Sequence, residues 1–146
     1  MVVIDGSYAG SLRCEAVHAE SGTRLLTDAP KDNEGLGASF SPTDLVATAL
    51  GTCVLSTIAI VARRRGIDVG TMRFRVEKHM ATDPVRRIGR LPLTVWLPAS
   101  LSAEQRLIVE RAAHTCPVHR SLGADVERPI EFVYEEAPPA GTRPRA

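Results

Sequence analysis

Three cysteines give this 146-residue chain its most obvious reactive groups: Cys14, Cys53 and Cys116. A cysteine thiolate can attack an electrophile, hold a metal ion or form a disulfide, depending on its surroundings. Cys116 stands in "HTCPVHRS", directly before Pro117, a residue that suits the first position of a helix. The spacing makes Cys116 a candidate N-cap, where free N–H groups and the helix dipole would favour its thiolate.

Cys53 lies in a long apolar segment, so its activation needs a cation brought from elsewhere in the molecule. A buried cysteine is most often a small hydrophobic side chain, and Cys53 taken alone fits that interpretation. The same interpretation describes Cys14, which lies between Leu12 and Ala16 in an alternating segment. The odd number of cysteines argues against a complete disulfide framework.

A zinc site and a hydrolytic Cys–His pair are the other chemistries to weigh. Cys116 and His119 are three residues apart, and His114 and Cys53 could join them as ligands. Zinc sites usually carry paired, closely spaced ligands, and here there is one such pair at most, so we expect no metal. His119 is also too local to act as a base for Cys116 without a third group to orient it.

The element that holds Cys53 is predicted to be a helix from Pro42 to Arg65. Ser41 is a good N-cap, and Asp44 occupies the acidic position of a capping box. Arginines 63 to 65 suit the negative end of the helix dipole, and Gly66 can close the helix.

This helix carries no charge between Asp44 and Arg63, and a helix that is apolar all round must be buried all round. One small domain covers about half of it, so we expect a second copy of the chain to cover the rest. Several small residues would let another backbone come close: Ala47, Ala49, Gly51 and Thr52. The alternative is a monomer whose long loop lies over the helix.

The same segment approaches the length of a membrane span. Thr and Ser residues lower its hydrophobicity, so we expect no membrane span.

The pattern of polar and apolar residues in the rest of the chain predicts an α+β domain. Its antiparallel sheets would expose one face to solvent and carry helices on one side. We expect strands within 1–27, 72–80, 91–97 and 130–135, a loop over 28–41, a turn or hairpin tip over 81–90, and helices over 102–114 and 116–123. A single domain is predicted over 1–136, with a disordered tail over 137–146.

Composition excludes some classes of partner. The net charge of +1 gives no reason to expect nucleic acid or an anionic membrane surface as a partner. No basic region followed by an apolar run opens the chain, so we expect no secretion signal and a cytoplasmic protein.

The motif "SPTDLVATALGTC", followed further along by "CPVHRSL", resembles the OsmC/Ohr family of thiol-dependent hydroperoxide reductases. The resemblance runs from about residue 20 to residue 135, and "LLTDAP" is closest to the OsmC-like branch. It implies an OsmC-like fold: an intertwined homodimer with long central helices back to back, wrapped by sheets from both chains, and an active site at the subunit interface.

The same resemblance implies a redox cycle between two of the cysteines. Cys53 would be the peroxidatic thiolate and would become a sulfenic acid on attacking an organic hydroperoxide. Cys116 would resolve it as a disulfide, and an external dithiol would restore both thiols, with no metal, flavin or haem. An apolar cleft between subunits would favour alkyl or lipid peroxides.

The family uses an arginine, itself held by an acid, to stabilise the thiolate. The acid normally follows the motif proline directly, but here Thr43 follows Pro42 and the acid is Asp44. Asp44 and Cys53 lie on opposite helix faces, about 13 Å apart along the axis, so Asp44 would serve a Cys53 site only from the other chain, or would serve only as a cap.

Two arginines of the N-terminal strands, Arg13 and Arg24, could supply the cation, and Arg24, nearer the motif, is preferred. The shifted acid leaves a second hypothesis open: a non-enzymatic OsmC-like dimer that binds a small apolar or thiol-reactive ligand. In this second hypothesis Cys53 is a passive or sensing thiol.

Overall fold

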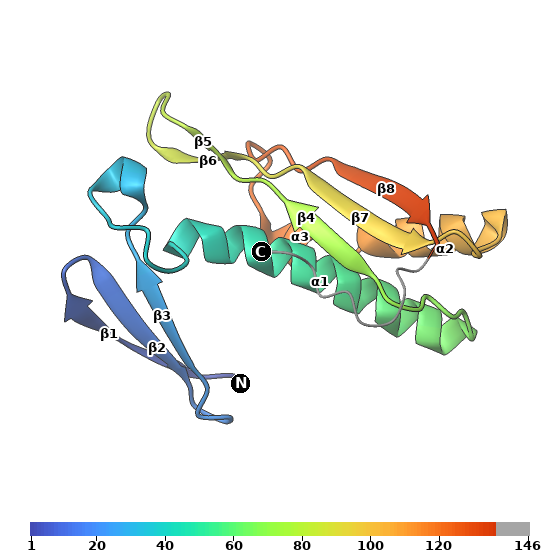
Figure 1. Cartoon of the computed structure of the whole chain (residues 1–146), viewed down its shortest axis with the longest axis horizontal. Coiled ribbons are helices and arrows are strands. Elements are labelled where there is room, and N and C mark those ends of the chain that lie inside the picture. The colour runs from blue at the N-terminus through green and yellow to red at the C-terminus, as the bar shows by residue number, and fades with distance from the viewer. Residues whose placement is uncertain (137–146) are drawn as a thin grey trace. The chain divides into compact units, whose positions relative to one another are not determined.

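The computed structural model describes residues 1–136 of the chain (Figure 1). These residues form two compact units, Met1–Val46 and the part of the chain from Ala47 onward. The disordered tail expected over 137–146 lies outside the described residues. The single domain expected over 1–136 stays a prediction, and we describe each unit by itself.

The first unit is built on a three-stranded antiparallel sheet, as the alternation in the first 27 residues predicted. Its strands lie in the order β1-β2-β3 and comprise β1 (Ile4–Gly10), β2 (Arg13–His18) and β3 (Arg24–Asp28). Ser11 and Leu12 both have positive φ in the β1–β2 turn, and Gly22 has φ +67° in the β2–β3 turn. The two-residue β1–β2 turn demands such left-handed conformations, and Gly22 adopts one without steric cost in the longer β2–β3 turn.

One face of this sheet carries the charges. The β2–β3 register pairs Arg13 with Asp28 and Val17 with Arg24, and side chains directly opposite one another share a face. Glu15 lies two residues after Arg13 and therefore projects to the same side. Both candidate arginines are thus on one face of one hairpin.

The other face of the sheet is apolar and carries Cys14. Register pairs Cys14 with Tyr8 on β1, and Ala16 with Leu25 on β3. Cys14 is exposed, and Tyr8 and Leu25 are 66% and 39% exposed. The prediction that Cys14 is a buried hydrophobic residue is therefore wrong, because nothing in the described chain covers its face of the sheet.

A loop with a short 3-10 helix, η1 (Lys31–Asn33), joins β3 to α1 (Pro42–Arg65). The limits of α1 are those predicted from the capping residues. The Ser41 N–H donates to Asp44 Oδ2 at 2.7 Å, and the Asp44 N–H donates to Ser41 Oγ at 3.2 Å, which completes the capping box. The helix crosses the boundary between the two units, so its residues from Ala47 onward belong to the second.

The second unit holds a three-stranded sheet, a two-stranded ribbon and two further helices. The sheet has the order β4-β7-β8 and comprises β4 (Arg73–Val76), β7 (Leu93–Pro98) and β8 (Ile130–Glu135). The ribbon pairs β5 (His79–Ala81) with β6 (Arg87–Arg90). The helices are α2 (Ala103–Ala113) and α3 (Pro117–Ser121). The region 72–80, expected as one strand, is therefore two.

One strand pair departs from the expected antiparallel sheets: β7 and β8 are parallel, with Leu93 opposite Ile130 and Pro98 opposite Glu135. The other strand pairs are antiparallel. A parallel pair needs a long crossover connection, and α2 and α3 lie between β7 and β8 in the chain.

Helices α1 and α2 pack on the same face of the β4-β7-β8 sheet. Phe74 of β4, Val95 of β7 and Phe132 of β8 are in register on that face. A Cβ added at Gly51 of α1 would lie 2.2 Å from the Phe74 ring, and His114 after α2 meets the Phe132 ring edge-on. Gly51, expected to admit a second copy of the chain, instead admits a side chain of its own sheet.

Only one stripe of α1 is buried. The stripe follows helical spacing and consists of Ala47, Leu50, Gly51, Val54, Ile58 and Ala62. Ile60, on another side of the helix, is 51% exposed. By length and composition α1 could cross a membrane, and a third of its most apolar stretch is buried. The core helix of a globular protein can have the same length and composition. Because a stripe of α1 packs on the β4-β7-β8 sheet, we interpret α1 as a core helix.

Candidate functional site

Two cysteines of the second unit lie side by side. α1 carries Cys53 near its middle, and the corner between α2 and α3 carries Cys116. The Cys53 side chain lies near enough to that of Cys116 to raise the pKa of the Cys116 thiol. Cys116 is fully buried, whereas Cys53 is half-buried. A buried thiol next to a more accessible one is the arrangement that disulfide exchange requires.

Cys116 is the N-cap of α3, as its position before Pro117 predicted. Its Sγ accepts a hydrogen bond from the backbone N–H of His119 at 3.5 Å. Burial raises the pKa of the Cys116 thiol, and the neighbouring Cys53 raises it further, while the N–H of His119 acts in the opposite direction. The net effect favours the protonated form of Cys116.

Two histidines, His114 and His119, lie on either side of Cys116 in the sequence, and their rings contact each other. The His119 ring meets the His114 ring edge-on, with centroids 5.6 Å apart. Burial, followed by the positive charge of Arg128, lowers the pKa of His119, which favours its neutral form. Within residues 1–136 no group of three or more His, Cys, Asp or Glu side chains could hold a metal ion.

Arg24, the preferred arginine, forms an ion pair with Glu15 on the charged face of the first unit. Its side chain is 69% exposed, and that of Glu15 is 29% exposed. The pair therefore lies largely in water, where ion pairs are weak.

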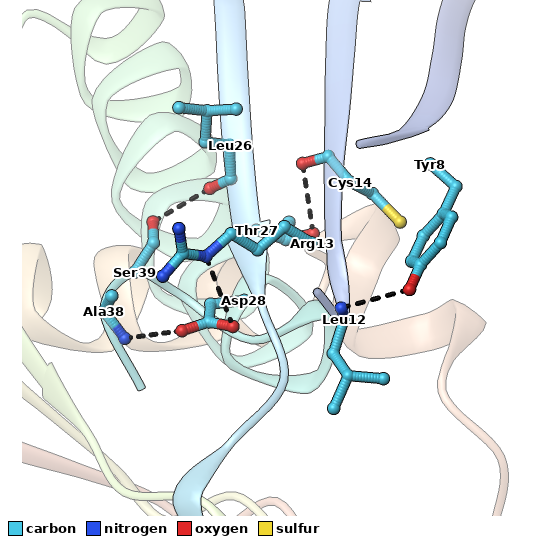
Figure 2. Close-up of polar contacts among 9 residues, drawn as sticks. All are labelled: Tyr8, Leu12, Arg13, Cys14, Leu26, Thr27, Asp28, Ala38 and Ser39. Carbon is cyan, nitrogen blue, oxygen red and sulfur yellow. Dashed lines mark hydrogen bonds and ion pairs between the residues drawn. The ribbon is translucent and has the colours of Figure 1, made fainter. Parts of the chain in front are cut away.

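Arg13 faces a very different acid. Its Nε lies 3.8 Å from Oδ1 of Asp28, whose side chain is only 1% exposed (Figure 2). The sequence analysis missed Asp28. Counting outward from the predicted turn at Ser21 and Gly22 would pair Arg13 with Pro30, so the observed register is what places Arg13 opposite Asp28.

Asp44 closes the capping box of α1 through the backbone N–H of Ser41, which is the structural role weighed for it in the sequence. It stands near the start of α1, and Cys53 lies further along the same helix. The helix geometry puts the two side chains on opposite faces.

A pocket of about 290 Å³ opens between the β5–β6 ribbon and the segment before β8. Two ion pairs line it, Arg87 with Asp125 at 3.4 Å and Arg90 with Glu127 at 3.3 Å. None of the three cysteines lines it, so this pocket is separate from the thiol pair.

Comparisons with known proteins show the family and the fold of this chain. The family model described as OsmC-like protein matches residues 34–130. A solved structure from Psychrobacter arcticus 273-4, of a candidate osmotic-stress-induced and detoxification response protein, is 38% identical to this chain. That match covers 91% of this chain and 96% of the other, with a TM-score of 0.84. No curated protein matches the sequence.

More distant solved structures share the fold. An organic hydroperoxide resistance protein OsmC from Legionella pneumophila is 16% identical, with a TM-score of 0.71 over 90% of this chain and 96% of that one. An organic hydroperoxide resistance protein from Elizabethkingia anophelis is also 16% identical, with a TM-score of 0.70 over 92% of this chain and 98% of that one.

The match over residues 34–130 spans the segments that carry both Cys53 and Cys116, and the Psychrobacter structure extends the likeness to nearly the whole chain. By its sequence and by its α+β fold around a long apolar helix, this chain is a member of the OsmC-like family.

Proposed function

We propose that this protein reduces organic hydroperoxides to alcohols by a two-cysteine cycle. The Cys53 thiolate attacks the terminal oxygen of the hydroperoxide; the O–O bond breaks, Cys53 becomes a sulfenic acid, and the alkoxide takes a proton to leave as the alcohol. The Cys116 sulfur then attacks the Cys53 sulfur, forming a disulfide and releasing water. A dithiol reductant returns both cysteines to thiols and becomes a disulfide itself.

The observation that carries this proposal is the proximity of the Cys53 and Cys116 side chains, which are near enough for Cys53 to raise the pKa of the Cys116 thiol. The half-buried sulfur is available to a substrate, and the buried, protonated one is held beside it to complete the disulfide. The fold shared with organic hydroperoxide resistance proteins supports the same chemistry. The cycle needs no metal, flavin or haem, and we propose that it runs in the cytoplasm.

The peroxidatic thiolate also needs a cation, because an ordinary thiol titrates near pH 8.5. The sequence favours Arg24 for this task over Arg13. Asp44, the acid suggested by the family motif, is engaged in the α1 capping box, so we propose that it acts chiefly as a cap.

We further propose that the working form is a homodimer. The chain alone buries one stripe of α1 and leaves the other sides of this uncharged helix partly exposed. A second copy would cover them and would create an apolar entrance suited to alkyl or lipid hydroperoxides.

A thiol count tests the proposed chemistry. Because Cys14 is exposed and would react on its own, the assay starts from reduced Cys14→Ser protein. One equivalent of cumene hydroperoxide should consume both remaining thiols within minutes. Cys53→Ser on the same background should lose none, and Cys116→Ser should stop at a Cys53 sulfenic acid, which dimedone traps.

A non-enzymatic role as a binder of an apolar or thiol-reactive ligand is the second candidate. The observations that favour it are the use of Asp44 as a cap and the pairing of Arg24 with Glu15. Full retention of thiols after exposure to cumene hydroperoxide would rule out the reductase and leave this binder.

A further inference from the structure

We propose that His114, His119 and Arg128 form a binding site for an oxyanion, namely a carboxylate or phosphate group of a small ligand. We call these three residues the basic corner. They all belong to the second unit and come from the C-cap of α2, the last turn of α3 and the segment before β8. The basic corner adjoins Cys116, but the proposal does not depend on the proposed function, since anion binding requires no redox chemistry.

The first argument is that the three side chains converge. The rings of His114 and His119 meet edge-on, with centroids 5.6 Å apart. The His114 ring also meets the Phe132 ring of β8, with centroids 6.4 Å apart, so it is held against the sheet. The charge of Arg128 is near enough to His119 to lower the pKa of its ring. Three side chains that can donate hydrogen bonds to an anion therefore lie in one small region.

The second argument is that no acid compensates the positive charge at the basic corner. Among residues 1–136, neither Arg128 nor its neighbour Arg120 forms an ion pair. The charges that shift the pKa of His119 are all positive, since each of them lowers it. By contrast, Arg87, which contacts the same segment before β8, is paired with Asp125 at 3.4 Å. A cluster of one sign without a counter-ion attracts an anion.

The third argument is how the Arg128 guanidinium uses its nitrogens. Nη1 donates to the carbonyl oxygens of Gly123 at 3.0 Å and Val126 at 2.7 Å. Nε is buried and has no hydrogen-bond acceptor in the described part of the chain, and no contact there engages Nη2, which solvent reaches. A partly desolvated guanidinium without an acceptor is costly, and a charge-assisted hydrogen bond to an anion would offset that cost. Arg128 is thus anchored through Nη1 and open at Nη2.

The fourth argument is the response that His119 would give to a ligand. Burial, followed by the charge of Arg128, lowers the pKa of this ring, so it is mostly neutral in the free protein at pH 7. The other charged or titratable groups that act on it are His114 and Arg120. A bound anion would favour the protonated ring, which would become a second charged donor beside Arg128. Anion binding should therefore tighten as the pH falls.

The first test follows the histidine rings of the parent protein by NMR. Their signals are titrated against pH in sodium chloride, sodium phosphate and sodium propionate at equal ionic strength. We expect at least one of the two oxyanions to raise the pKa of His119 by about half a unit or more relative to chloride. A larger effect of phosphate indicates a phosphate-bearing ligand, and a larger effect of propionate indicates a carboxylate. His18 on β2 and His79 on β5 are internal controls whose signals should respond alike in the three salts.

The second test compares Arg128→Gln with Arg87→Gln by calorimetric titration of the same anions at pH 6. Arg87 is the matched control, because its Nη1 also donates to a carbonyl of this segment, that of Asp125 at 3.2 Å, but its charge is already paired. We expect Arg128→Gln to weaken oxyanion binding by about tenfold or more and Arg87→Gln to stay within about twofold of the parent. If Arg128→Gln does not fold, His114→Gln, at an exposed position, carries the test with an expected loss of about threefold.

Identical His119 titrations in chloride, phosphate and propionate would overturn the proposal. Oxyanion binding that survives Arg128→Gln unchanged, or that falls equally in Arg87→Gln, would overturn it as well. No peroxide is used in either experiment, so the anion site and the proposed reductase can fail separately.

Discussion

The two thiols of the candidate site differ in burial, and the difference suits the order of action proposed for them. Cys116 is fully enclosed, and its pKa is raised by that burial and by the neighbouring Cys53. Cys53 is half-buried. A protonated, enclosed thiol is a poor first nucleophile and a suitable second one, since the first oxidation brings the electrophile to it.

The shifted pKa of His119 predicts how stability depends on pH. Burial and Arg128 lower this pKa below the ordinary value of 6.5, so the folded protein favours the neutral ring. The contribution is complete above pH 6.5, the value in the unfolded chain, and is lost as the pH falls toward the lower folded value. We expect the thermal midpoint to drop more between pH 7.5 and 5 in the parent than in His119→Gln.

His79→Gln is the matched control for this pH series, because His79 is an exposed histidine on the β5–β6 ribbon. It should leave the parent's pH dependence in place. A His119→Gln profile parallel to that of the parent would show that this ring does not contribute.

For single residues, the sequence predicted roles that depend on neighbouring residues in the chain. The N-cap role of Cys116 followed from Pro117 and is confirmed. The burial of Cys14 was predicted wrongly, because alternation shows which side chains share a face but not which face is covered. The burial of Asp28 and its pairing with Arg13 were not predicted, because they depend on strand register and on a folded loop, and neither is visible in a single residue type.

At the scale of helices and strands, α1 packs closely on the β4-β7-β8 sheet at Gly51. A Cβ at Gly51 would lie 2.2 Å from the Phe74 ring, so the helix backbone approaches the sheet as far as that ring allows. Gly51→Ala should therefore lower the free energy of unfolding, even though alanine favours a helix. Overpacking costs about 1–3 kcal/mol and the gain in propensity offsets about 0.5–1 kcal/mol, which leaves a net loss of about 1 kcal/mol.

Urea unfolding monitored by circular dichroism measures this loss. The double variant Gly51→Ala with Phe74→Leu should recover part of it, because the smaller side chain makes room for the methyl group. A Gly51→Ala protein more stable than the parent would mean that the ring moves without cost.

Element limits were predicted best where end signals are strong. α1 begins and ends at the predicted residues because Ser41, Asp44 and Gly66 define its termini chemically. The break between β4 and β5 and the parallel pairing of β8 were not predicted. The alternation of polar and apolar residues indicates a strand, but it does not indicate the direction of that strand or the strand with which it pairs.

At the scale of the whole molecule, the uneven burial of α1 leads to a prediction about assembly. We expect the parent to sediment at twice the 15.7 kDa chain mass. Ile60→Asp, at a 51% exposed position of α1, should shift the protein toward the monomer by at least about tenfold in dissociation constant, because a buried unpaired charge is costly.

Leu107→Asp is the matched control, since Leu107 is an equally exposed leucine, at 54%, on α2. It should leave the sedimentation of the parent unchanged. A parent protein that sediments at 15.7 kDa would contradict the homodimer and would require another cover for α1.

The parallel pairing of β7 with β8 also governs how this protein can mature during synthesis. β8 runs to Glu135 and is the last strand of the described chain, yet it forms one edge of the sheet whose middle strand is β7. A nascent chain still tethered to the ribosome cannot complete that sheet until Glu135 has left the exit tunnel. The crossover through Cys116 stays unanchored at its far end until then, so the thiol that the finished fold encloses is not yet protected from oxidants.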